Sequence, residues 1–145
     1  MERRAGMKLR LAFLAAATLG FGPHGASAAE NAPRLDQCLA AVVDNEHGSR
    51  WPAVVICYET ELDAQDRRLQ SVYRTLEAAA PRLGGPAMDQ IASSRRQWAA
   101  YRDSWCAFEQ DHAIAANADV ARLSCRIELT RTQADRVAEQ AAAIR

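Results

Sequence analysis

The chain has 145 residues, of which 49% are hydrophobic and 25% are charged, and its 18 basic and 18 acidic side chains give no net charge. This length corresponds to a single domain. Because no basic excess is available to neutralise phosphates, the composition argues against a nucleic-acid partner.

The first 28 residues have the three parts of an export signal. Basic residues come first, an apolar run follows over residues 11–21, and small residues at 26–28 offer a cleavage site. The apolar run is about half of the ~20 residues that a membrane-spanning helix needs. We therefore predict a signal peptide over residues 1–28, one domain over residues 29–145, a periplasmic or secreted location, and no membrane anchor after cleavage. The basic residues are Arg3, Arg4, Lys8 and Arg10.

Cleavage changes the charge of the chain. It removes four basic residues and one acid from 18 of each, which leaves 14 basic and 17 acidic side chains and a net charge of about −3. A weakly acidic surface favours encounter with a basic protein.

Four cysteines follow the signal in two matched pairs, Cys38 with Cys57 and Cys106 with Cys125, each pair separated by 18 residues. An even number of cysteines in a short exported domain predicts disulfides. Structural zinc is disfavoured because no two cysteines have the close spacing of zinc ligands. No metal and no cofactor is predicted.

The rest of the sequence predicts helices, because alanine and arginine are frequent and no stretch alternates β-branched with polar residues. A short helix is expected from Asp36 to Val43, and Gly48 and Pro52 end that pattern. A long helix follows from Ala53 to about Ala80, and the glycines and prolines of residues 81–86 form a turn.

Two further helices complete the pattern. One runs from about Pro86, a proline suited to a first turn, to Ala113. Its aromatic residues lie at helical spacing, and we interpret Trp98, Tyr101 and Trp105 as core residues. The last helix runs from about Val120 to Ala142, with Asp119 as the predicted N-cap. The sequence thus predicts an all-α protein, a small antiparallel bundle of one short and three longer helices.

Bundle geometry limits the disulfide pairing. The two longest helices meet at the Gly84–Gly85 turn, so Cys57, Cys106 and Cys125 all lie toward the opposite end. Of the three possible pairings we favour Cys38–Cys57 with Cys106–Cys125, because each bridge then joins neighbouring helices across a short break. A Cys57–Cys106 bridge remains an alternative.

Two halves of the chain carry motifs with characteristic spacing: Cys57–Leu62, Asp66–Gln70 and Tyr73 in the first, and Arg96–Trp98, Tyr101–Asp103, Cys106–Glu109, Ser124–Arg126, Leu129 and Thr130 in the second. Through these residues the chain resembles the lysozyme inhibitor LprI-like N-terminal domain of exported bacterial proteins from Gln37 to Val137. It departs from the usual family pattern at Gln70, where asparagine is usual, and at Gln133, where arginine is usual.

Neighbours on a helix do not face one another, so Arg102 and Asp103 are each expected to bond another helix. The predicted partner of Arg102 is Asp66 or Glu59, across the bundle. Buried pairs of this kind specify helix register more than they add stability. The acids Glu59, Glu61, Asp63 and Asp66 are interpreted as a solvated helix face.

The resemblance implies binding and inhibition of a lysozyme-type glycosidase. An inhibitor of this kind occludes a cleft in which two carboxylates act, and it needs no catalytic residue of its own. The loop from Asn45 to Pro52, with Arg50 and Trp51, is the candidate partner-binding segment, because Trp and Arg are common in binding hot spots. The alternative is a periplasmic binding or envelope-stress module without inhibitory activity. No enzyme is predicted, since His47 and His112 have no recognisable catalytic partners in the sequence.

Overall fold

The computed structural model describes residues 32–42, 49–113 and 116–144, and all regular structure in these ranges is helical. Helix α1 spans Ala32–Ala41, α2 spans Trp51–Ala79, α3 spans Ala87–His112 and α4 spans Ala118–Ala143, with a short 3₁₀ helix η1 at Ala80–Leu83. The predicted all-α bundle is therefore confirmed. The predicted signal peptide lies outside the described residues. None of the described helices combines the length and apolarity that a membrane span requires.

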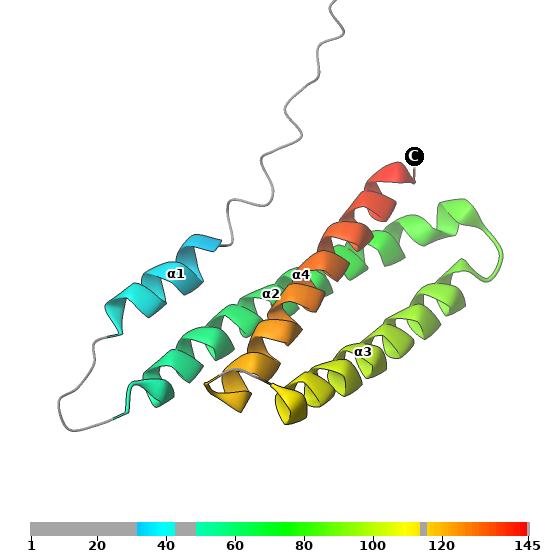
Figure 1. Cartoon of the computed structure of the whole chain (residues 1–145). Coiled ribbons are helices and arrows are strands. Elements are labelled where there is room, and N and C mark those ends of the chain that lie inside the picture. Colours follow the sequence, from blue (N-terminus) through cyan, green and yellow to red (C-terminus); the bar gives the residue numbers. More distant parts are fainter. Residues whose placement is uncertain (1–31, 43–48, 114–115, 145) are drawn as a thin grey trace, which may run out of the picture.

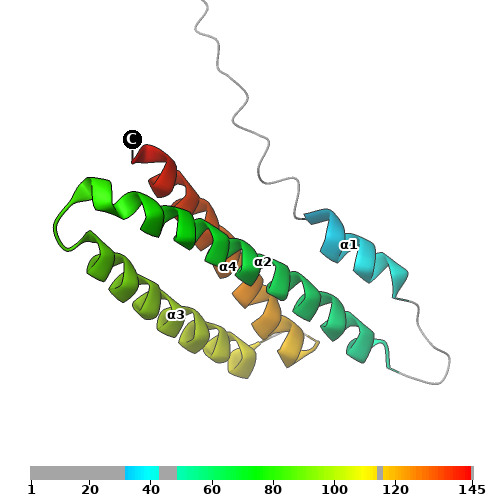
Figure 2. The ribbon, with the colours of Figure 1, turned by 180° about the vertical axis from the view of Figure 1, so that it is seen from behind.

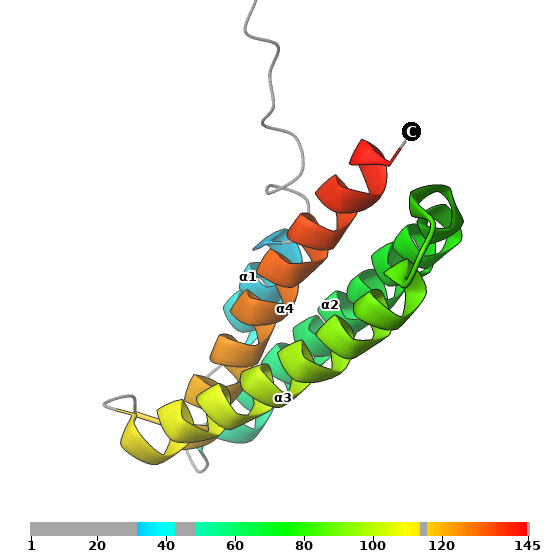
Figure 3. The ribbon, with the colours of Figure 1, turned by 90° about the vertical axis from the view of Figure 1, so that its right-hand side faces the viewer.

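Helices α2, α3 and α4 form an antiparallel three-helix bundle, and α1 lies along the first half of α2 (Figures 1 and 2). Helix α4 packs against both α2 and α3, whereas α2 and α3 come close mainly at η1. Seen from the side, α2 and α3 run next to each other and α4 lies along one side of them (Figure 3). The contact between α2 and α3 therefore depends on side chains.

The helix boundaries follow from local chemistry. Gly84 and Gly85 adopt positive φ values of 64° and 57° between η1 and α3, which glycine does at little steric cost. Pro86 lies at the N-cap of α3, one position before the first turn in which we had expected it. The N-cap of α4 is Asn117, whose side chain accepts a hydrogen bond from the Val120 N–H at 3.0 Å. The prediction of Asp119 as this cap was wrong, because Asp119 already lies in the first helical turn.

The apolar core lies between α2 and α4. Leu69 and Tyr73 of α2 pack with Ala134 and Val137 of α4, and Trp98 of α3 packs against this cluster. The buried residues of α4 repeat at helical spacing, so that Ile127 and Thr130 lie on the same buried face as Ala134. Three aromatic residues of α3 are not in the core: Tyr101, Trp105 and Phe108 are 52%, 44% and 51% exposed. The assignment of Tyr101 and Trp105 to the core was therefore wrong.

All four cysteines form disulfides with the favoured pairing, Cys38–Cys57 and Cys106–Cys125, at Cα–Cα distances of 5.7 and 5.6 Å. The first bridge ties α1 to α2, and the second ties the last turns of α3 to α4. Both bridges lie toward the end of the bundle opposite the Gly84–Gly85 turn. Each bridge joins cysteines 19 residues apart in the sequence, and each spans one helix connection at the same end of the molecule.

The two bridges should differ in their effect on stability. Removing Cys106–Cys125 by a double change to alanine should lower the free energy of unfolding by about 3 kcal/mol, the chain-entropy value for a loop of this size. The matched change at Cys38 and Cys57 should mainly release α1, since among the described elements α1 packs chiefly against α2. Urea unfolding followed by circular dichroism measures the first effect, and amide exchange of α1 measures the second. Equal protection of α1 with and without its bridge would contradict this.

Candidate functional site

The start of α2 carries the residues predicted to bind a partner. Arg50 is exposed at the N-cap and Trp51, the first helical residue, is partly buried. The Trp51 N–H donates to the Ser49 hydroxyl at 3.2 Å, and the Arg50 carbonyl accepts from the Val54 N–H at 3.1 Å. Residues 45–48 of the predicted binding loop lie outside the described residues. The structure therefore places Arg50 and Trp51 together at an accessible helix start.

A second surface, missed in the sequence analysis, follows the last three turns of α3. We call Tyr101, Trp105, Phe108 and His112 the α3 aromatic stripe. Their rings follow one another with centroid distances of 6.4, 5.6 and 4.3 Å. The indole N–H of Trp105 donates to the Glu109 carboxylate at 2.7 Å, and His112 Nδ1 donates to the Phe108 carbonyl at 2.9 Å. The spacing of i, i+4, i+7 and i+11 was visible in the sequence, but it equally fits a buried face.

A cavity of about 760 Å³ opens at the other end of the bundle, near the Gly84–Gly85 turn. Its size is in the range of small-molecule pockets. Apolar side chains such as Leu76, Ile91 and Val137 form much of its wall, and Arg82 and Arg136 are its charged residues. Gln133, which replaces the arginine usual in the resembled family, also lines it and donates to the Tyr73 hydroxyl at 3.0 Å. No acidic side chain is among the described residues that line this cavity.

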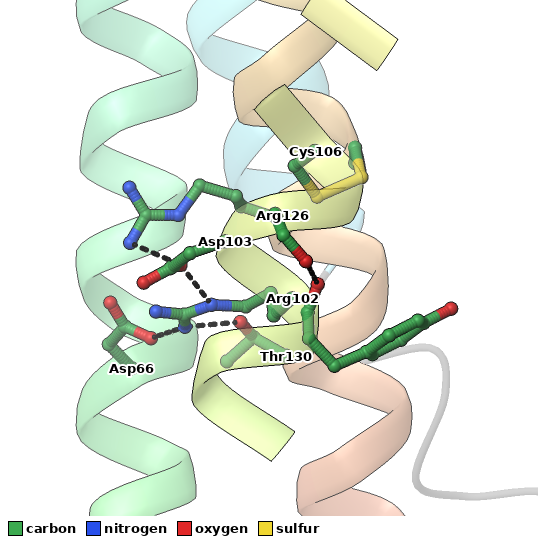
Figure 4. Close-up of polar contacts among 9 residues, drawn as sticks. Asp66, Arg102, Asp103, Cys106, Arg126 and Thr130 are labelled. Atoms are coloured by element: carbon green, nitrogen blue, oxygen red, sulfur yellow. Dashed lines mark hydrogen bonds and ion pairs between the residues drawn. A yellow bond between two sulfur atoms is a disulfide. The ribbon is translucent and has the colours of Figure 1, made fainter. Parts of the chain in front are cut away.

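Arg102 connects the three long helices from the buried side of α3 (Figure 4). Its Nη1 donates to Asp66 of α2 at 2.9 Å and to the Thr130 hydroxyl of α4 at 3.1 Å. The guanidinium lies 5.0 Å from the centre of the Trp98 ring, within cation–π range. The expected pairing with Asp66 is confirmed.

Asp103 extends this cluster. It accepts from Arg102 Nε at 3.0 Å and lies 3.5 Å from Arg126 Nη2 of α4. Asp103 thus bonds another helix as predicted, but the expectation that neighbouring Arg102 and Asp103 do not meet was wrong. The long arginine side chain bends back to its neighbour. In this cluster the charges of two arginines are balanced by those of two aspartates. We therefore interpret it as a group that stabilises the fold.

The acidic face predicted for α2 is not uniformly solvated. Glu61 is buried and accepts from the Gln65 side-chain amide at 2.7 Å, and Asp66 is bonded to Arg102. Glu59 and Asp63 are exposed as expected. Within residues 32–42, 49–113 and 116–144, no group of three or more His, Cys, Asp or Glu side chains is placed to hold a metal ion.

One comparison with known proteins gives a family. The family model described as "Lysozyme inhibitor LprI" matches residues 44–137, which is more than half of the chain. No curated protein and no solved structure is similar enough to count as a match.

The Arg102 cluster should contribute to folding. Arg102→Ala should lower the free energy of unfolding by about 3 kcal/mol, because it leaves the buried Thr130 hydroxyl and the Asp66 carboxylate without their partner. Arg96→Ala is the matched control, since Arg96 is exposed on the same helix, and it should change stability by less than about 0.5 kcal/mol. Denaturant unfolding measures both. Similar losses for the two variants would mean that the cluster has no structural role.

Proposed function

The chain belongs to the lysozyme inhibitor LprI family, and we propose that it is an exported protein that binds and inhibits a lysozyme-type glycosidase. The observation that carries the proposal is the family match over residues 44–137. The two disulfides fit an exported protein, since such bridges persist in oxidising compartments. The signal features of residues 1–28 support a periplasmic or secreted location.

A rigid shape favours such an inhibitor. Binding orders side chains and loops, and a surface that is already ordered loses less entropy when it docks. Here the two bridges fix the helix connections at one end of the bundle, where α2 begins and α3 ends (Figure 1). We propose that this end, which we call the bridged end, faces the enzyme.

Arg50 and Trp51 are the proposed contacts with the enzyme cleft. A glycosidase of this class cleaves with two carboxyl groups, and a guanidinium is suited to bonding carboxylates with two parallel hydrogen bonds. Arg50 is exposed at the start of α2, where the helix dipole adds positive potential. Trp51 beside it is partly buried, and the exposed part of its ring adds apolar contact area. Inhibition would follow from occupation of the cleft, without chemistry by the inhibitor.

The second candidate function is an envelope binding or stress module without inhibitory activity. Titration of the purified exported protein against lysozyme on a cell-wall substrate distinguishes the two. The inhibitor proposal expects dose-dependent loss of substrate cleavage. No inhibition at tens of micromolar would leave only the second function.

Substitution of Arg50 or Trp51 tests the proposed contact. Each alanine variant should raise the dissociation constant for lysozyme about thirtyfold, the effect of losing a hot spot worth about 2 kcal/mol. Added salt should reduce the contribution of Arg50 more than that of Trp51, because only the arginine contact depends on charge.

Arg67→Ala is the control for this test, because Arg67 is also exposed on α2 and lies more than four turns away. It should leave both binding and the thermal midpoint unchanged. Calorimetric titration measures binding, and thermal unfolding shows whether a variant is folded. Wild-type affinity in both the Arg50 and Trp51 variants would exclude the start of α2 as the contact.

A further inference from the structure

We propose that the α3 aromatic stripe is a docking surface for arginine and lysine side chains of a basic protein partner. The identity of that partner rests on the proposed function, which makes it the lysozyme-type enzyme. The stripe is separate from Arg50 and Trp51, but it also lies toward the bridged end.

The stripe is exposed without a role in the core. Tyr101, Trp105 and Phe108 are 52%, 44% and 51% exposed, and none belongs to the buried cluster of α2 and α4. Folding alone does not account for three large aromatic side chains in a row on a surface. Tyrosine and tryptophan at a surface are typical of binding hot spots, in which they supply contact area at a small entropic cost.

The rings are already ordered. Each contacts the next along the helix, and the Trp105 indole is held by its hydrogen bond to Glu109. The Cys106–Cys125 bridge lies within the same turns of α3 and fixes them to α4. The stripe extends over about 16 Å of helix, at 1.5 Å per residue. A partner would therefore meet a prearranged surface of several aromatic faces.

The charges around the stripe select the partner. Glu109 and Asp111 lie beside the rings in sequence and on the helix, and the stripe ends at the negative end of the α3 dipole. Residues 101–112 contain one arginine, Arg102, and no lysine. The Arg102 guanidinium is buried and bonds Asp66 and Asp103, so it does not add positive charge to the exposed stripe. Aromatic faces with neighbouring carboxylates attract cations and repel acidic surfaces.

The chain makes the same kind of contact internally. The Arg102 guanidinium lies 5.0 Å from the Trp98 ring while it bonds two carboxylates, and Arg95 lies 5.1 Å from the Tyr73 ring. An arginine of the partner placed against Trp105 and Glu109 would find the same two groups, a ring face and a carboxylate. The stripe therefore offers on the outside the chemistry that Trp98 and Asp66 offer on the inside.

The cavity at the opposite end does not fit this partner. Its charged residues are Arg82 and Arg136, with no acid among its described lining residues, so it would repel a basic surface. The cavity and the stripe thus differ in charge. Of these two regions, the stripe is the one that combines apolar area with neighbouring carboxylates.

Alanine substitution of Trp105 and Phe108 tests the proposal. Each variant should raise the inhibition constant for lysozyme at least tenfold, and the pair together more than thirtyfold. The matched control is Met88→Ala, because Met88 is 49% exposed on the same helix but lies at the other end. It should leave the inhibition constant unchanged. All variants should keep the thermal midpoint within about 3 °C of wild type.

Two substitutions that each remove one negative charge test whether the partner is basic. Glu109→Gln keeps the shape of the side chain and removes its charge, and it should weaken inhibition about fivefold at low salt and less at high salt. The control Glu128→Gln removes an exposed charge of α4 and should have no effect. Trp105→Phe keeps an aromatic face and should retain more inhibition than Trp105→Ala. Equal inhibition by wild type and the Glu109 variant would overturn the assignment of a basic partner.

Two other occupants of the stripe give distinct results. If a second copy of the chain covers the stripe, sedimentation will show a dimer that Trp105→Ala dissociates. If the glycan of the substrate binds there, the wild-type protein will pellet with insoluble cell wall and the stripe variants will not. Either result would overturn the proposal.

The failures of the two proposals are separable. Wild-type protein that neither binds nor inhibits lysozyme overturns the inhibitor function and the partner identity together. Wild-type protein that inhibits, with stripe variants that inhibit equally well, overturns the stripe alone and leaves the function intact.

Discussion

The bundle depends on one arginine that links three helices. Helices α2 and α3 come close mainly at η1, so most of their length is joined by side chains. Arg102 spans this space, with Asp66 on one side and Thr130 on the other, and Trp98 stacks beneath its guanidinium. An arginine suits this position because its planar group offers several donors in fixed directions and tolerates partial burial. Directional bonds of this kind favour one register of the three helices over a slipped one.

This polar centre explains why the aromatic residues of α3 lie outside. At about 100° per residue, Trp98 lies about 40° from Arg102 around the helix, Trp105 about 60°, and Tyr101 and Phe108 about 100° and 120°. Their exposure follows this order, from the partly buried Trp98 to Tyr101 and Phe108, which are each about half exposed. The buried face of α3 is centred on Arg102 and Cys106, and the aromatic side chains flank it. Apolar area that a simpler bundle would bury is therefore available to a partner.

The sequence was sufficient to predict the helices, the turn at Gly84–Gly85 and the disulfide pairing, because glycine, proline and cysteine act locally or over short breaks. Helix α4 was also predictable, since its buried residues, such as Ile127 and Ala134, repeat at helical spacing. The buried face of α3 could not be predicted from the sequence. Its aromatic residues form a stripe whose centre is displaced from the side that is buried. The partners of Arg102 on two other helices, together with the Cys106–Cys125 bridge, determine which side turns inward. The N-cap of α4 was missed for a related reason, since Asn117 and Asp119 are both good caps and the path of the connection decides between them.

Two kinds of rigidity meet at the bridged end. The disulfides fix the connections covalently. The Arg102 cluster, which lies one helical turn before Cys106 in α3, fixes the helices by directional hydrogen bonds. At the opposite end, the described residues include no disulfide, and the helices surround a cavity whose wall is largely apolar, with the Gln133–Tyr73 hydrogen bond in it. A protein that acts by binding gains most where its surface is held in one conformation before the partner arrives. The start of α2 and the aromatic stripe of α3 both project from this stiffened half, which is why a contact surface is better supported there than at the turn.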